Sequence, residues 1–333
     1  MLRFNKSRST TKESLTMKLP TATRTAPRQA RRSLRSALGA LLTAALAYGA
    51  FGTIGAAHAQ QNDTLAKIKQ NGVIILGHRE SSIPFSYTNG REVMGYSHEI
   101  MMAIVDKVKT QLNMPNLQVR MIPITSQNRI SLMQNGTIDL ECGSTTNNLE
   151  RQKQVGFTNS LFVYGIRMLV RKDAGVKDFD DLKGRNVVTT AGTTGERLLV
   201  KMNGEKAMNM NLTGAKDHGQ AFLMLESGRA VAFVMDEPLL YGELTKAKNP
   251  GEWTVAGTPL QTENYACMLR KDDPQFKALA DGVIADLMKS GKAEQLYKKW
   301  FQSPIPPRGI NMNYPLSAEM KELFANPNDK AFQ

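Results

Sequence analysis

The segment from Glu141 to Arg151 combines small hydroxyl side chains with one arginine. The apolar run that precedes it, 137–140, is typical of a buried strand. Ser144 and Thr146 then lie on a predicted turn, and Arg151 lies at the start of a predicted helix. Hydroxyl groups and a helix N-terminus can hydrogen-bond a carboxylate, and arginine can bind it through two parallel N–H donors. The segment therefore predicts a pocket for the carboxylate of a small metabolite.

The elements that must position this pocket alternate between helix and strand. The apolar run 73–76 predicts a strand, and apolar residues at helical spacing over 97–112 predict a helix. A predicted strand at 117–122 and a short helix at 126–135 follow. Such alternation predicts an α/β protein in which parallel sheets are flanked by helices.

One unit, a helix end followed by a glycine and a strand, occurs twice. Segment 132–140 resembles segment 224–232, and a polar residue follows each strand, Ser144 in the first and Asp236 in the second. Chance recurrence of a common unit is the alternative explanation. Two α/β lobes that place polar residues at the carboxyl ends of their strands would form a ligand cleft between them.

A second pair of similar segments, 163–173 and 264–272, predicts two hinge strands that carry the chain into a second lobe and back. The predicted boundaries are lobe 1 at 60–165 and 268–305, lobe 2 at 170–265, and a C-terminal tail at 306–333 that packs on lobe 1.

The first 59 residues have the organisation of an export signal that is removed. A basic region with ten Lys and Arg residues is followed by an Ala-rich apolar stretch at 37–57 and by the small-x-small site Ala57-His58-Ala59. Four glycines interrupt the apolar stretch and argue against the alternative, a transmembrane anchor. We therefore expect a soluble product in the periplasm. Two points stay open. Arg31-Arg32 indicates the twin-arginine export route as an alternative to the Sec route, and Met17 is an alternative start of the chain.

Removal of this leader changes the charge balance. The whole chain has a net charge of +13, from 43 basic and 30 acidic residues. Ten basic residues and one acidic residue belong to the leader, so the remaining 274 residues carry 33 basic and 29 acidic residues, a net charge of +4. The overall charge therefore gives no support for nucleic acid as a partner.

Cys142 and Cys267 both lie in predicted strand-like segments. An oxidising compartment permits a disulfide between them, and two separate buried thiols are the alternative. Neither has a Cys or His at ligand spacing, so we predict no metal site and no cofactor. The sequence also lacks the GxSxG, P-loop and HExxH motifs of common enzyme classes.

Seven segments of the chain carry a resemblance to a known family. They are 78–87, 124–129, 142–151, 216–219, 226–233, 297–301 and 303–307. On these segments, and from Leu65 to the tail, the chain resembles the extracellular solute-binding proteins of amino-acid ABC importers, and within them the subgroup for acidic amino acids. The resemblance implies a two-lobed α/β periplasmic-binding-protein fold of the Venus-flytrap type, with two hinge strands and the ligand in the cleft between the lobes.

The resemblance also implies a ligand-binding site and partners. The α-carboxylate of the ligand would contact Arg151, Ser144, Thr146 and Thr194, with Thr193 as the alternative to Thr194. The α-ammonium would contact Asp236. The side-chain carboxylate would contact Arg79, Arg129 and His218, with Ser126 nearby. The implied partners are L-glutamate or L-aspartate and the permease subunits of an inner-membrane ABC importer, and we expect a monomer.

The charges of these residues agree with an acidic ligand. Three arginines, one histidine and one aspartate exceed what a simple zwitterion needs, so the surplus cations predict a second carboxylate on the ligand. Each residue also has an ordinary explanation. Arg151 and Arg79 could be solvated surface charges, His218 a core or capping histidine, and Asp236 a helix N-cap. Spacing alone does not choose between these explanations.

We expect a binding protein that closes on its ligand, not an enzyme. Two alternatives stay open from the sequence. Periplasmic cyclohexadienyl or arogenate dehydratases share this fold, and such an enzyme would use Glu80 or Glu141 with His218 for acid–base chemistry. A ligand-sensing partner of a membrane receptor would use the same pocket.

Overall fold

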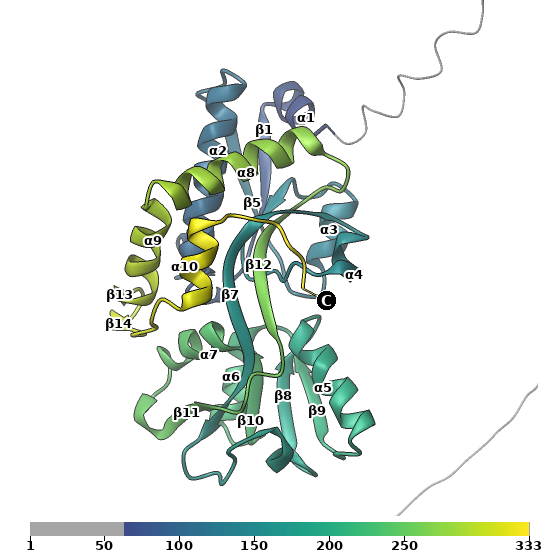
Figure 1. Cartoon of the computed structure of the whole chain (residues 1–333), viewed down its shortest axis with the longest axis vertical. Coiled ribbons are helices and arrows are strands. Elements are labelled where there is room, and N and C mark those ends of the chain that lie inside the picture. Colours follow the sequence, from purple (N-terminus) through teal and green to yellow (C-terminus); the bar gives the residue numbers. More distant parts are fainter. Residues whose placement is uncertain (1–62, 333) are drawn as a thin grey trace, which may run out of the picture. The chain divides into compact units, whose positions relative to one another are not determined.

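The computed structural model describes residues 63–332 (Figure 1). The predicted export signal, 1–59, lies outside the described residues. Helix α1 (Thr64–Asn71) begins where the Asp63 side chain accepts a hydrogen bond from the Ala66 N–H, and it ends at Gly72, whose φ of 67° is left-handed. Within the described range, no helix is both long and apolar enough to cross a membrane.

One half of the molecule is built on strands β5 (Gln118–Pro123), β1 (Val73–His78) and β6 (Leu140–Glu141). Strand β1 pairs in parallel with both neighbours, so the carboxyl ends of these strands meet at one edge of the sheet. This half also holds α2 (Tyr96–Gln111), α3 (Arg129–Gln134) and α8 (Pro274–Lys289). The apolar residues of α2 that the sequence placed on one face are buried.

The other half is built on β8 (Asn186–Thr190), β9 (Asn211–Ala215) and β10 (Ala232–Asp236), with β11 (Trp253–Ala256) on its far side. Strand β8 pairs in parallel with β9 and β10. Helices α5 (Thr194–Glu205), α6 (His218–Glu226) and α7 (Glu237–Leu244) each follow one of these strands. This order of strand then helix places helix N-termini at the carboxyl edge of the sheet.

Two antiparallel strands connect the halves. The first part of strand β7 (Gly156–Arg171) pairs with β12 (Thr262–Leu269), which lies next to β6. The second part of β7 pairs with β10. The strand order is β5-β1-β6-β12-β7-β10-β8-β9, and Figure 1 shows β7 and β12 running from one half into the other. These strands include most of the predicted hinge segments. The exact lobe boundaries remain our proposal.

Shorter elements complete the fold. A three-stranded sheet lies next to the first half, and a hairpin and two helices follow α8. The remaining elements are β2 (Ser81–Ser82), β3 (Ser86–Thr88), β4 (Val93–Met94), α4 (Leu149–Gln152), η1 (Phe179–Leu182), η2 (Pro250–Glu252), α9 (Lys292–Phe301), β13 (Pro304–Ile305), β14 (Ile310–Asn311) and α10 (Ala318–Ala325).

Aromatic rings form much of the core beside β7. Phe162 stacks on Tyr297 and Phe301 of α9, with centroids 5.8 and 4.9 Å apart. Phe85 meets Phe162 edge-on at 5.0 Å. Such contacts add to the apolar area that the rings bury. The segment 297–301, part of the resemblance, therefore supplies core packing.

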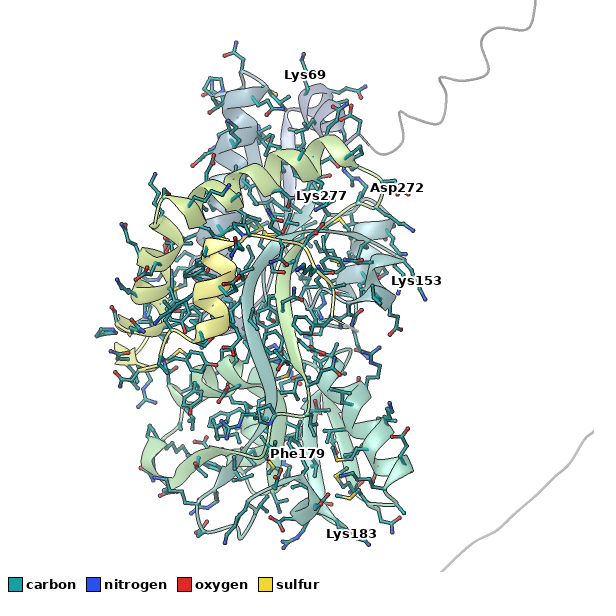
Figure 2. The ribbon with its side chains drawn as sticks, viewed as in Figure 1. Lys69, Lys153, Phe179, Lys183, Asp272 and Lys277 are labelled. Carbon is teal, nitrogen blue, oxygen red and sulfur yellow. A yellow bond between two sulfur atoms is a disulfide. The ribbon has the colours of Figure 1, made fainter. Side chains whose placement is uncertain are left out.

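The chain after α10 crosses both connecting strands. The Ser160 N–H of β7 donates to the Asn328 carbonyl, and the Asn264 amide of β12 donates to the Lys330 carbonyl at 2.8 Å. Phe332 pairs with Asn148, just before α4. Lys277 of α8, labelled in Figure 2, forms an ion pair with Asp329 of the tail at 3.0 Å. These contacts attach the tail beside the segment that carries Arg151.

Cys142 and Cys267 form a disulfide, and both residues are fully buried. The bond joins the residue after β6 to the middle of β12 and closes a chain segment across 125 positions. It therefore links the predicted carboxylate-binding segment covalently to one of the connecting strands.

We expect the paired replacement Cys142→Ala and Cys267→Ala to lower the free energy of unfolding by about 5 kcal/mol, because a loop of this length gains entropy when it is released. Urea unfolding with and without dithiothreitol measures this. The reductant should shift the midpoint of the natural protein and leave that of the paired variant in place. A natural protein whose unfolding ignores the reductant would contradict this account.

Candidate functional site

Three arginines of the predicted site are buried where the two halves meet. Arg79 follows β1, and Arg129 is the first residue of α3. Arg151 lies in α4, and its backbone N–H donates to the side chain of Asn148, the N-cap of that helix. The exposed fractions are 1%, 1% and 8%. The explanation of Arg79 and Arg151 as solvated surface charges is therefore wrong. Burial lowers the pKa of Arg129 and Arg151 to about 10, which still leaves both charged at neutral pH.

The Arg79 guanidinium is held by hydroxyl groups and by a histidine. It donates to Ser144 Oγ at 3.2 Å and to Ser126 Oγ at 2.9 Å, and it contacts His218 Nε2 at 3.3 Å. Because arginine only donates, Nε2 must accept, and Nδ1 carries the proton given to Thr190 Oγ1 at 2.8 Å. Burial and the nearby arginines hold the His218 pKa well below its usual value, so the imidazole is neutral.

Arg129 lies beside a buried acid. It donates to the Ser144 carbonyl at 2.9 Å and to Thr145 Oγ1 at 2.8 Å. Thr145 in turn donates to Glu141 Oε2 at 2.7 Å. Burial raises the pKa of Glu141, although Arg129, Arg79 and Arg151 oppose the shift. Over residues 63–332, Arg129 Nε is a buried donor without a partner, so one more acceptor can bind here.

Arg151 connects the two halves. Its guanidinium donates to the Thr146 carbonyl at 3.1 Å and to the Gly192 carbonyl, across the junction, at 3.3 Å. A cavity of about 260 Å³ opens beside it, lined by Ser126, Gln127 and Thr194 among others. The predicted α-carboxylate site therefore lies at a junction that both halves complete.

Asp236 ends β10 and has one free oxygen. Tyr265 donates its hydroxyl proton to Oδ2, whereas Oδ1 has no partner in the part of the chain described. The residue occupies the N-cap position of α7, as the ordinary explanation expects, but its side chain makes no capping hydrogen bond. Burial, followed by the charge of Glu263, raises the Asp236 pKa to about 7.

Thr193 and Thr194 differ in their contacts. Thr193 is the N-cap of α5, accepting from the Glu196 N–H and donating to the Thr190 carbonyl at 2.7 Å. Thr194 lies deeper, with its hydroxyl 3.5 Å from that of Thr146. We therefore keep Thr194 as the site residue. All nine predicted site residues are buried. Polar contacts link two clusters of them: the first is Arg79, Ser126, Arg129, Ser144 and His218, and the second is Thr146, Thr194 and Arg151.

The sequence reasoning missed Glu263, Tyr164 and Tyr265 as site residues. Glu263 of β12 accepts from Tyr164 at 2.8 Å and from Thr194 at 2.6 Å. The sequence analysis counted only one acid, Asp236, in the site. Glu141 and Glu263 are two further buried acids that this count left out. An acid within a predicted strand-like segment was the available signal.

Close backbone contacts between the halves lie on two sides of the site. A Cβ on Gly242 of α7 would clash with the Ile83 carbonyl and lie 2.7 Å from its carbon. A Cβ on Gly192, whose φ is 79°, would lie 2.7 Å from Gln127 Cα. Only glycine permits these approaches, so the structure is in a closed arrangement around the site.

Fold and site together define a two-lobed protein that binds a small charged solute. The chain belongs to the bacterial extracellular solute-binding proteins, family 3, whose pattern matches residues 74–303. The predicted family is therefore confirmed.

Two relatives are similar over most of the chain. The Glutamate/aspartate import solute-binding protein of Escherichia coli K12 is 60% identical over 269 residues, which are 80% of this chain and 89% of that protein. The L-glutamate/L-aspartate-binding protein of Pseudomonas aeruginosa PAO1 is 58% identical over 270 residues, with the same shares of each chain. These relatives are solute-binding proteins, and this chain is likewise a binding protein and not an enzyme.

Solved structures agree on the fold. A mutant of ArgBP from T. maritima matches with a TM-score of 0.63 and 26% identity, covering 72% of this chain and 99% of that one. An ancestral arginine-binding protein matches with a TM-score of 0.61 and 26% identity, covering 69% and 98%. The predicted two-lobed α/β fold is confirmed.

The raised pKa of Asp236 predicts a pH-dependent stability. The pKa of Asp236 is about 7 in the folded protein and 3.8 in its usual state, so the folded protein binds this proton more tightly than the unfolded chain does. The resulting stabilisation is fully present below about pH 4 and is lost as the pH rises through 7. Asp236→Asn lacks the titration. We expect the natural protein to lose more free energy of unfolding than Asp236→Asn between pH 4 and 8.

Urea unfolding of ligand-free protein at several pH values measures the difference. Glu243, whose pKa burial also raises to about 7, is present in both proteins, so the comparison isolates Asp236. Parallel stability curves for the two proteins would show that Asp236 is solvated and would contradict the buried site.

Proposed function

We propose that this protein is the periplasmic substrate-binding component of an ABC importer for L-glutamate and L-aspartate. The observation that carries the proposal is a set of three buried arginines, each of which interacts electrostatically with a buried aspartate, Asp236, that has one oxygen without a partner among the described residues. Two carboxylates and one ammonium are the groups that this set of donors and acceptors would bind. The names of the two relatives support the same ligands.

The ligand would lie with its amino-acid end beside Arg151, Thr194 and Asp236. Arg151 would bind the α-carboxylate and Asp236 Oδ1 the α-ammonium. The side-chain carboxylate would lie beside Arg79 and Arg129, whose free Nε is available to it. Ser126, Ser144 and neutral His218 would fix the Arg79 guanidinium in place.

The partners follow from this role. The loaded, closed protein would dock on the permease subunits of an inner-membrane importer, and it would act as a monomer in the periplasm. Closure about β7 and β12 would couple ligand binding to recognition by the permease, because the ligand binds the closed arrangement more tightly than the open one.

Calorimetric titration of the mature protein, 60–333, tests the proposal after bound ligand is removed by unfolding and refolding. The panel is glutamate, aspartate, glutamine, asparagine and arginine. Glutamate or aspartate should bind tightly, and their amides at least about tenfold more weakly, a difference of about 1.4 kcal/mol. Tighter binding of an amide or of arginine would contradict the proposal, and so would no binding across the panel.

Two arginine variants separate the ends of the ligand. Arg151→Ala should weaken glutamate and glutamine alike, by about 2–5 kcal/mol, because both carry the α-carboxylate. Arg79→Ala should weaken glutamate far more than glutamine, because only glutamate has the second carboxylate. The same panel by calorimetry measures both, and an equal loss of the two ligands in Arg79→Ala would refute the role given to Arg79.

The closure contact predicts a separate effect at Gly242. Alanine is favoured over glycine inside a helix by about 1 kcal/mol, so Gly242→Ala should leave the ligand-free protein as stable or more stable. In the closed arrangement the added Cβ would clash with the Ile83 carbonyl. We expect the open protein to lack this contact. We expect at least tenfold weaker binding of glutamate and aspartate, with the ratio of their affinities unchanged.

Gly282→Ala is the matched control. Gly282 lies in α8, and a Cβ there would meet nothing within 4 Å. This variant should keep the affinity of the natural protein. Thermal unfolding of ligand-free protein and calorimetry measure both variants. A lower melting temperature of ligand-free Gly242→Ala would show that the contact also exists in the open protein and would contradict this account of closure.

A further inference from the structure

Glu263 lies on connecting strand β12 and is fully buried. It accepts hydrogen bonds from groups on three segments of the chain. The Tyr164 hydroxyl of β7 donates to Oε2 at 2.8 Å, the Thr194 hydroxyl at the start of α5 donates to the same oxygen at 2.6 Å, and the Gln261 amide donates to Oε1 at 3.2 Å. One carboxylate therefore joins a connecting strand to the first residue of α5.

The protons of these hydroxyl groups can be counted, because each hydroxyl has only one. Tyr164 gives its proton to Glu263. The contact between Thr146 Oγ1 and the Tyr164 oxygen at 2.8 Å must then be donated by Thr146. Thr194 also gives its proton to Glu263. Both threonine hydroxyls therefore retain only acceptor capacity for a ligand.

This capacity suits one chemical group of the ligand and excludes another. A carboxylate needs donors, whereas an ammonium needs acceptors. The Thr146 and Thr194 oxygens lie 3.5 Å apart. Asp236 belongs to the same cluster through Tyr265, which donates to Asp236 and whose ring lies 4.2 Å from that of Tyr164. Asp236 Oδ1 is a further buried acceptor, unpartnered among the described residues.

We propose that Glu263 is a positioning residue that orients the hydroxyls of Thr146 and Thr194 as acceptors for the protonated amine of the ligand. The inference rests on the proposed function and refines it. It revises the expectation from the resemblance that these two hydroxyls bind the α-carboxylate. Glu263 thereby contributes to selection of amino acids over plain dicarboxylates without touching the ligand.

The test compares L-glutamate with glutarate, which has the same two carboxylates and no amine. Tyr164→Phe keeps the ring and the charge of the site but removes the oxygen that accepts the Thr146 proton. Glu263→Leu removes the acceptor for both Tyr164 and Thr194. The freed hydroxyls can then donate to a carboxylate. Affinities come from calorimetry, with glutarate measured by displacement of glutamate.

The expected result is a fall of at least about tenfold in the preference for glutamate over glutarate in Tyr164→Phe, and a larger fall in Glu263→Leu. Tyr87→Phe is the matched control, because the buried Tyr87 hydroxyl donates to the Pro306 carbonyl and has no part in this chain of hydrogen bonds. Its preference for glutamate should equal that of the natural protein.

An equal loss of both ligands in Tyr164→Phe would show a merely structural role and overturn the inference, and so would an unchanged preference. The Tyr164→Phe result decides the matter even if Glu263→Leu does not fold, because the ring stays in place. Failure of the natural protein to bind glutamate would instead refute the proposed function, so the two failures are distinguishable.

Discussion

Burial of three guanidinium groups where the two lobes meet is the constraint on which the rest of the structure depends. An uncompensated buried charge is costly, so every N–H of these groups needs an acceptor. The fold supplies serine and threonine hydroxyls, backbone carbonyls and a neutral imidazole. It also supplies three acids, Glu141, Asp236 and Glu263. Burial raises the pKa of Glu141, and it raises the pKa of Asp236 to about 7.

The strands that connect the lobes also take part in the site. Strand β7 contributes Tyr164, and β12 contributes Glu263 and Tyr265. The disulfide at Cys267 ties β12 to the segment that leads to Ser144 and Arg151. Movement at these strands therefore changes the positions of the groups that contact the ligand. This arrangement gives closure a direct physical link to binding.

The sequence predicted much of the fold because the apolar periodicity is strong. The predicted strand at 117–122 is β5 at Gln118–Pro123, and the predicted helix at 126–135 is α3, which begins three residues later. The predicted hinge segment 163–173 covers only the second part of β7, which begins at Gly156. Strand length depends on pairing with β12, β10 and β11, and local sequence does not encode those partners.

The site was predicted less completely, for a physical reason. The ordinary explanation of Arg151 as a surface charge could be rejected only once its burial was known. Thr194 was predicted with Thr193 as its alternative, and the capping bond of Thr193 is what distinguishes the two in the structure. Glu263 was overlooked because an acid in a strand is usually exposed on an edge. Its burial depends on Tyr164 and Thr194, which are distant in the chain.

The most direct test of the account is a crystal structure of the complex with L-glutamate. The account predicts closed lobes, with the α-carboxylate on Arg151, the ammonium within hydrogen-bond distance of Asp236 Oδ1, and the side-chain carboxylate between Arg79 and Arg129. A ligand bound the other way round, with its α-carboxylate between Arg79 and Arg129 and its side-chain carboxylate on Arg151, would contradict it. A ligand held by one lobe with the cleft open would contradict it as well.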